Sequence, residues 1–143
     1  MQKIRIALAD NHDKVREMWQ YILSTDASFE IVALCCNGLE AVEAAAVYRP
    51  DIFLMDINME EMNGIEATGI ISKNHPSIRI IGMSVHAEAS YVKGMLEAGA
   101  RGYLTKTTAY AEVISAIKTV YEGEQYICTE ARNEITVFAI AKI

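Results

Sequence analysis

The sequence predicts an α/β fold in which helices cover both faces of a doubly wound parallel sheet. Three observations favour this fold. Apolar runs alternate with helical patterns five times within the first 123 residues. The 143-residue chain is 52% hydrophobic and 22% charged, which suits one globular domain with its own core. Five strand–helix units are too few for a closed barrel, which needs eight.

Five short apolar runs are the expected strands, because each is bounded by polar or turn-forming residues. In chain order they cover residues 4–9, 29–36, 52–55, 78–83 and 101–104. Apolar residues at helical spacing follow each run. These helical patterns cover residues 15–23, 39–47, 65–71, 92–96 and 113–120. Pro50, Pro76, Gly99 and Gly123 follow the second to fifth patterns and end these helices.

The last twenty residues predict no second domain. They hold only two basic residues, Arg132 and Lys142, so a DNA-binding helix-turn-helix does not fit. Thr129 could cap a short helix, but residues 135–143 also alternate like a strand, and both readings stay open. We expect one domain over residues 1–123 and a tail or linker start over 124–143, packed on its own domain. A truncated regulator and a single-domain regulator both fit this pattern.

Charge and composition exclude several classes of function. Thirteen basic against nineteen acidic residues give a net charge of −6, so the domain should not itself bind nucleic acid or an anionic membrane. Charges appear too early for a signal peptide, and no apolar run is long enough to span a bilayer. Cys35, Cys36 and Cys128 form no disulfide framework, which indicates reduced thiols in a cytoplasmic protein.

Polar residues stand where the predicted strands end. Asp10 and Asn11 close the first strand, Asp56 the third and Ser84 the fourth, while Lys106 follows the fifth. In doubly wound sheets, ligands bind outside the carboxyl ends of the strands. One crevice should therefore hold two carboxylates, an amide, a hydroxyl and an ammonium group.

Simpler roles exist for most of these residues. Asp10 or Asn11 could cap the first helix, Ser84 could cap the fourth, and Lys106 could be a solvated surface lysine. Asp56 is harder to explain in this way, because an acid that closes a four-residue apolar run is costly unless it is paired or bound to a metal.

Taken together, the five groups suit transfer of a phosphoryl group to a carboxylate. An aspartate can attack as a nucleophile and form an acyl phosphate. Oxygen ligands suit Mg²⁺, which would neutralise phosphoryl charge. A lysine and a hydroxyl can bind further phosphoryl oxygens.

Four motifs resemble the receiver domain of bacterial response regulators, in order and spacing over residues 3–123. They are Ala9-Asp10-Asn11-His12, residues 54–67 (LMDINMEEMNGIEA), Ile81-Gly82-Met83-Ser84 and Gly102-Tyr103-Leu104-Thr105-Lys106. Thr107 after Lys106 and the segment 123–127 (GEQYI) are similar to receivers that precede a LuxR-type helix-turn-helix. The resemblance implies a flavodoxin-like (βα)5 fold with strand order 2-1-3-4-5.

The resemblance also implies a role for each site residue. Asp56 is the expected phosphoacceptor and Lys106 the phosphate-binding lysine, while Ser84 and Tyr103 form the switch. The expected Mg²⁺ ligands are Asp10, Asn11, Asp56 and the backbone carbonyl of Asn58. Val85 and His86 would flank the phosphoryl group and tune its hydrolysis. Tyr103 could equally be a core tyrosine, and His86 an exposed histidine at a helix start.

The implied protein is a phosphoacceptor rather than a classical enzyme, although it would catalyse its own phosphorylation and dephosphorylation. Its partners would be a sensor histidine kinase and, after phosphorylation, a second copy of itself. Through an output domain it would control transcription.

Two departures from the family pattern affect the site. Asn11 replaces a second acid, which removes one negative charge from the metal pocket, and Glu60 replaces a proline, which leaves its loop less constrained. Asn11 supports the alternative of a pseudo-receiver that is not phosphorylated. The hypothesis of an aspartate-nucleophile phosphohydrolase has less support, because Asn58 stands where an acid is needed. The hypothesis of a flavin-binding module has the least support, because residues 10–14 lack a phosphate loop.

Overall fold

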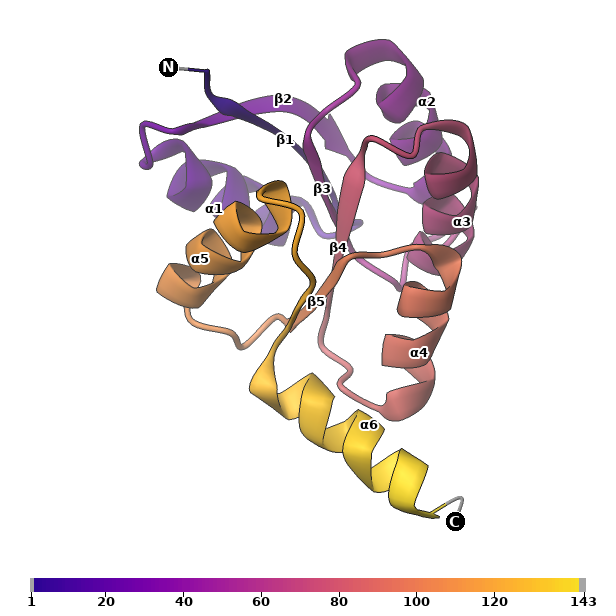
Figure 1. The fold of residues 1–143 in the computed structure, drawn as a ribbon. Helices are drawn as coiled ribbons and strands as arrows, with labels where there is room; N and C mark the ends of the chain where they lie inside the picture. The colour runs from indigo at the N-terminus through magenta and orange to yellow at the C-terminus, as the bar shows by residue number, and fades with distance from the viewer. Residues whose placement is uncertain (1, 142–143) are drawn as a thin grey trace.

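The computed structural model describes residues 2–141, with side chains described as far as residue 136, and it has alternating strands and helices (Figure 1). The strands are β1 (Ile4–Ala9), β2 (Phe29–Cys35), β3 (Ile52–Met55), β4 (Arg79–Ser84), β5 (Gly102–Thr105) and β6 (Tyr126–Ile127). The helices are α1 (Asp13–Ser24), α2 (Gly38–Tyr48), α3 (Gly64–Asn74), α4 (Ala89–Ala98), α5 (Tyr110–Tyr121) and α6 (Thr129–Ala141). The five predicted units are all present, with strand ends within about one residue of expectation.

The sheet is parallel throughout, with strand order β2-β1-β3-β4-β5-β6. The first five strands follow the predicted order 2-1-3-4-5, but the prediction of a five-stranded sheet is wrong, because β6 adds a sixth strand. Gly123, at a φ of 100°, turns the chain after α5. The Tyr126 amide then donates to the Arg101 carbonyl at 3.1 Å, and the Cys128 amide to the Tyr103 carbonyl at 3.0 Å. A strand of two residues is too short to produce a recognisable sequence pattern.

The helices form a layer on each face of the sheet (Figure 1). Helices α1 and α5 lie on one face, and α2, α3 and α4 on the other. Every residue of β3 is buried, as expected for a central strand covered on both sides. The core also takes in Val113, Ile117 and Val120 from α5, each with no exposed surface.

Helix α6 resolves the open question about the tail in favour of a helix. It packs against α4 and β5, so the tail does lie on its own domain, and Ala131 is completely buried there. Lys142 and Ile143, the last residues of the expected alternation, lie outside the described residues. Within residues 2–141, no helix is both long and apolar enough to cross a bilayer.

Candidate functional site

The two site aspartates directly follow neighbouring strands. The Asp10 amide donates to the Cys35 carbonyl at 3.0 Å, and the Asp56 amide to the Ala9 carbonyl at 2.9 Å. The sheet ladder therefore continues one residue past the strands and fixes both backbones. Asp10 is 7% exposed and Asp56 is 5% exposed. The fold thus holds two acidic side chains in a largely water-excluded position.

Lys106 lies between the two carboxylates. Its Nζ is 2.7 Å from Oδ2 of Asp10 and 3.3 Å from Oδ2 of Asp56. Its amide donates to the Ser84 carbonyl at 2.9 Å, which extends the β4–β5 ladder in the same way. Lys106 is therefore not a solvated surface lysine. One ammonium group faces two carboxylates, so the cluster keeps a net negative charge.

The charge balance shifts the acidity of Asp56. Burial is the largest influence and raises the pKa of the Asp56 carboxyl; the Asp10 charge raises it further, and Lys106 opposes both. The net effect is a pKa above the ordinary value. The ionised form of Asp56 is therefore under-compensated, and a further cation nearby would stabilise it.

The residues at this position fit a hard divalent cation. Besides the two carboxylates, Oδ1 of Asn11 is buried and makes no hydrogen bond within the described part of the chain. A buried amide oxygen without a partner is unfavourable unless it meets water or an ion. Asn58 lies two residues beyond Asp56 and is exposed. Carboxylate, amide and carbonyl oxygens are the ligands that Mg²⁺ prefers.

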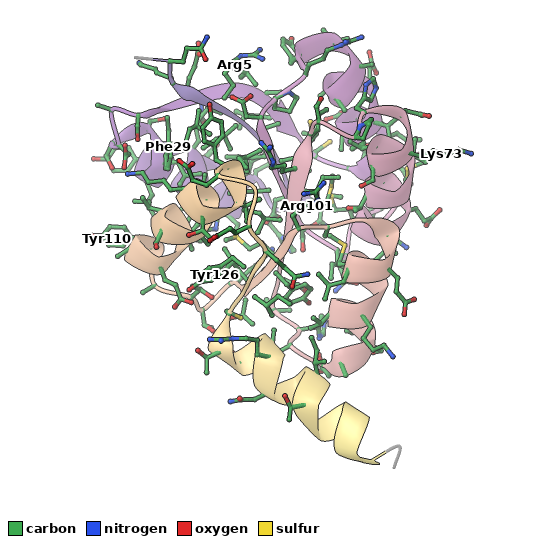
Figure 2. The ribbon with its side chains drawn as sticks, viewed as in Figure 1. Arg5, Phe29, Lys73, Arg101, Tyr110 and Tyr126 are labelled. Atoms are coloured by element: carbon green, nitrogen blue, oxygen red, sulfur yellow. The ribbon has the colours of Figure 1, made fainter. Side chains whose placement is uncertain are left out.

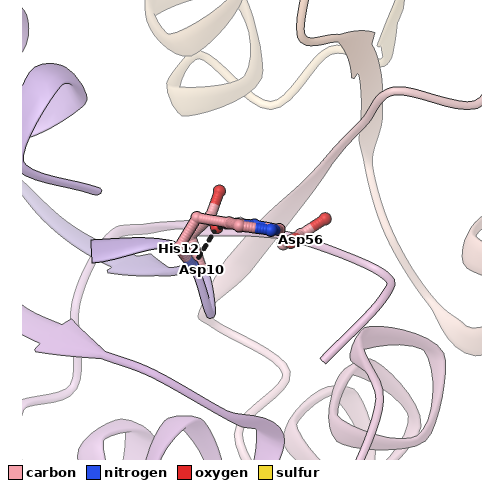
Figure 3. A group of neighbouring side chains, drawn as sticks. All are labelled: Asp10, His12 and Asp56. Atoms are coloured by element: carbon pink, nitrogen blue, oxygen red, sulfur yellow. Dashed lines mark hydrogen bonds and ion pairs between the residues drawn. The ribbon is translucent and has the colours of Figure 1, made fainter. Parts of the chain in front are cut away.

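His12 belongs to the same cluster, although sequence reasoning did not include it among the site residues. Its Nδ1 is 3.4 Å from Oδ1 of Asp10 (Figure 3). Ligand atoms of Asp10, His12 and Asp56 all lie within 4.8 Å of one another. The position of His12, two residues beyond Asp10, was the signal that could have identified it.

Arg16 and Trp19 of α1 lie beside the two site aspartates. The Arg16 guanidinium donates to the Asp10 carbonyl at 2.6 Å and pairs with Asp13 at 2.7 Å. Together with Asp10 and Asp56, Arg16 and Trp19 line a cavity of about 20 Å³, which is enough for roughly one water. Trp19 is the single tryptophan of the chain, so its fluorescence reports on this position.

The predicted switch residues lie on neighbouring strands, Ser84 on β4 and Tyr103 on β5, and both bond to the backbone of His86. Gly82 pairs with Tyr103 across the two strands, and the absence of a side chain at Gly82 leaves room for the tyrosine ring, which is completely buried. Burial raises the pKa of the Tyr103 phenol, and the neighbouring Ser84 hydroxyl opposes this effect in part. The phenol also donates to the His86 carbonyl at 2.5 Å, and the His86 amide donates to Ser84 Oγ at 3.1 Å.

The two residues after Ser84 lie in different environments. Val85 is 69% exposed. The His86 ring stacks on Tyr91 with centroids 4.6 Å apart, and its Nδ1 is 3.4 Å from a Glu88 carboxylate oxygen. His86 is therefore held by neighbours rather than projecting freely into solvent.

The loop after Asp56 is closed by Gly64 at the start of α3. The Gly64 amide donates to the Ile57 carbonyl at 2.8 Å, and a Cβ at Gly64 would lie only 1.9 Å from the Asp56 carbonyl oxygen. Within this loop Glu60 is exposed, and Glu61 adopts a left-handed φ of 68°. The close approach at Gly64 fixes the backbone that carries Asp56.

The fold and the acidic pocket agree with the receiver domain that the sequence resembles. The family model described as "Response regulator receiver domain" matches residues 6–118, and the chain belongs to this family. It is thus a receiver domain of two-component response regulators, and its relatives are of the LuxR family.

Individual relatives agree with this assignment. The chain is 41% identical over 125 residues to the transcriptional regulatory protein DegU of Brevibacillus brevis, covering 87% of this chain and 53% of that protein. It is 34% identical over 137 residues to the response regulator UvrY of Escherichia coli K12, covering 96% of this chain and 63% of that protein. The chain therefore spans between half and two-thirds of the length of these curated relatives.

Solved structures show the same fold. A two-component response regulator of the LuxR family from Aurantimonas sp. SI85-9A1 superposes with a TM-score of 0.92 at 29% identity, covering 97% of this chain and 99% of that one. The receiver domain of the putative regulator NarL from Mycobacterium tuberculosis superposes with a TM-score of 0.83 at 27% identity, covering 87% of this chain and 100% of that one. The flavodoxin-like receiver fold predicted from the sequence is confirmed.

Proposed function

We propose that this receiver accepts a phosphoryl group on Asp56 from a sensor histidine kinase. The observation that carries the proposal is the placement of Lys106 between two buried carboxylates, beside the unpartnered amide oxygen of Asn11. Excess negative charge in a buried cluster lowers the stability of the fold, and a pseudo-receiver that is not phosphorylated has no need for such a cluster.

In the proposed reaction, an Asp56 carboxylate oxygen attacks the phosphorus of a phosphohistidine, the P–N bond breaks and the imidazole leaves with the electron pair. Lys106 would donate to a phosphoryl oxygen, and Ser84 would donate to another. Asp10, Asn11, Asp56 and the Asn58 carbonyl would hold Mg²⁺, which neutralises phosphoryl charge. Hydrolysis of the acyl phosphate by water would reset the domain, and Val85 and His86 would tune its rate.

The switch would operate through the two hydrogen bonds that join Ser84 and Tyr103 to the His86 backbone. A phosphoryl group adds about −1.5 to −2 charges and three acceptor oxygens. If Ser84 turns toward one of them, its bond to the His86 amide is lost, and the β4–α4 segment rearranges. Since the Tyr103 ring is already buried, the change is expected in the His86 segment more than in the ring.

The partners of the domain follow from the same proposal. We expect phosphorylation to strengthen a homodimer. On α5, Val113 and Ile117 belong to the core, which leaves Tyr110, 61% exposed and directed away from the body in Figure 2, as the main apolar group for such a contact. Helix α6 covers part of α4 and β5, so those elements offer less free surface.

We further propose a receiver over residues 1–123, with residues 124–143 leading to an output domain that controls transcription. The greater length of the curated relatives and the name of DegU, a transcriptional regulatory protein, support this. Cys35, Cys36 and Cys128 are free thiols, which is consistent with a cytoplasmic site of action.

The test is incubation with acetyl phosphate and Mg²⁺, followed by intact mass measurement. We expect the mass of one phosphoryl group, and little or none when EDTA removes the metal. Lys106→Met should slow the reaction by roughly two orders of magnitude. Lys73→Met, a change on the outer side of α3 (Figure 2), should leave it unaltered. Absence of any phosphorylation would instead support the pseudo-receiver.

A further inference from the structure

We propose that His12 is a direct metal ligand, so that this site binds first-row transition ions such as Co²⁺ through an imidazole nitrogen. The inference deepens the proposed function and rests on it, because the ion would occupy the position proposed for Mg²⁺. It concerns which ion the pocket selects.

The distances suit a shared ion. Nδ1 of His12 and Oδ1 of Asp10 are 3.4 Å apart. Two neighbouring ligands at right angles, each about 2.1 Å from an ion, are separated by about 3 Å. Only a small movement is therefore needed for both atoms to bind one ion. Asp56 completes the group, since all three ligand atoms lie within 4.8 Å of one another.

The two oxygens of Asp10 face different partners. Oδ2 accepts a hydrogen bond from Lys106 at 2.7 Å, whereas Oδ1 faces His12. An ion on the Oδ1 side can therefore bind without displacing the ammonium group. The backbone of His12 is already anchored there, because its amide donates to Oδ1 of Asp10 at 2.9 Å. The His12 side chain is 67% exposed, so its ring has room to turn toward an ion.

The composition of the pocket explains why an imidazole matters here. Asn11 contributes a neutral amide oxygen. Asp10 and Asp56 are then the only acidic ligands in the group, and both also face Lys106. Imidazole is a strong ligand for Co²⁺, Ni²⁺ and Zn²⁺ and a poor one for Mg²⁺. A pocket with His12 should therefore gain affinity for transition ions without a matching gain for Mg²⁺.

Calorimetric titration with Co²⁺ and, separately, with Mg²⁺ tests the inference on the wild-type chain, His12→Gln and the control His75→Gln. His75 lies at the end of α3, outside the cluster. We expect His12→Gln to weaken Co²⁺ binding roughly tenfold or more and Mg²⁺ binding by less than about threefold. The control should match the wild type. Proton NMR should show strongly shifted signals of a Co²⁺-bound imidazole, which disappear in His12→Gln.

Equal Co²⁺ affinity in wild type and His12→Gln, or shifted imidazole signals that persist without His12, would overturn the inference. Equal losses for Co²⁺ and Mg²⁺ would also overturn it, because they would indicate a general disturbance of the pocket. Phosphorylation of the wild type by acetyl phosphate with Mg²⁺ is the separate test of the proposed function. Phosphorylation together with equal Co²⁺ affinities would leave that function standing and refute only the role of His12.

Discussion

Replacement of Gly64 by alanine should disturb the site more than any other single-methyl change in α3. The added Cβ would lie 1.9 Å from the Asp56 carbonyl oxygen, 2.8 Å from its carbonyl carbon and 2.9 Å from Cα of Ile57. Ordinary contacts begin near 3.4 Å, so the two segments must separate by roughly 1.5 Å. All three atoms are backbone atoms, so no flexible side chain can move aside.

The expected cost has two parts. Overpacking of this kind typically lowers the free energy of unfolding by about 1–3 kcal/mol. Displacement of a reacting group by about 1 Å can slow a reaction roughly a hundredfold. Gly64→Ala should therefore be less stable and should accept phosphate from acetyl phosphate far more slowly than the wild type.

Gly69→Ala provides the matched control within the same helix. A Cβ at Gly69 meets nothing within 4 Å, and alanine favours a helix over glycine by up to about 1 kcal/mol. Urea denaturation followed by Trp19 fluorescence should show Gly69→Ala as stable as the wild type or more so. The reasoning is refuted if Gly64→Ala unfolds within about 0.5 kcal/mol of the wild type and is phosphorylated at the same rate.

Three further predictions concern the charges and hydrogen bonds of the site. The raised pKa of Asp56 means that its ionised form destabilises the fold. The free energy of unfolding of Asp56→Asn should therefore exceed that of the wild type by about 1–2 kcal/mol at neutral pH. Thermal denaturation should show this difference vanish as the pH falls through the Asp56 pKa. Asn11→Asp should tighten Mg²⁺ binding about tenfold by calorimetry and lower the stability of the metal-free chain; unchanged affinity would contradict a ligand position at residue 11. Tyr103→Phe should lower the free energy of unfolding in urea by about 1 kcal/mol, because the 2.5 Å hydrogen bond to the His86 carbonyl disappears. An unchanged denaturation midpoint would show that this hydrogen bond adds nothing to stability.

The sequence carries most of the information about the sheet. The five apolar runs specify buried strands, and parallel strands bring their carboxyl ends to one edge, so the grouping of Asp10, Asp56 and Lys106 follows from topology alone. The second contact of Lys106, with Asp10, is not evident from a sequence, since it depends on how a long side chain lies between two acids. The inclusion of His12 depends in the same way on side-chain direction.

The C-terminal segment was less predictable. Residues 135–143 alternate in hydrophobicity as a strand would, yet the segment is helical as far as residue 141, because it packs against α4 and β5. Strand β6 is specified by backbone pairing with β5 rather than by a side-chain pattern. Both features arise from tertiary contacts that local periodicity does not encode.

If Asp56 alone receives the phosphoryl group, intact mass measurement after treatment with acetyl phosphate and Mg²⁺ will show it in a single experiment. The control is Glu17→Gln, which removes an exposed acid of α1. The wild type and Glu17→Gln should each gain the mass of one phosphoryl group, and Asp56→Asn should gain none. A phosphoryl mass on Asp56→Asn equal to that on the wild type would contradict the assignment.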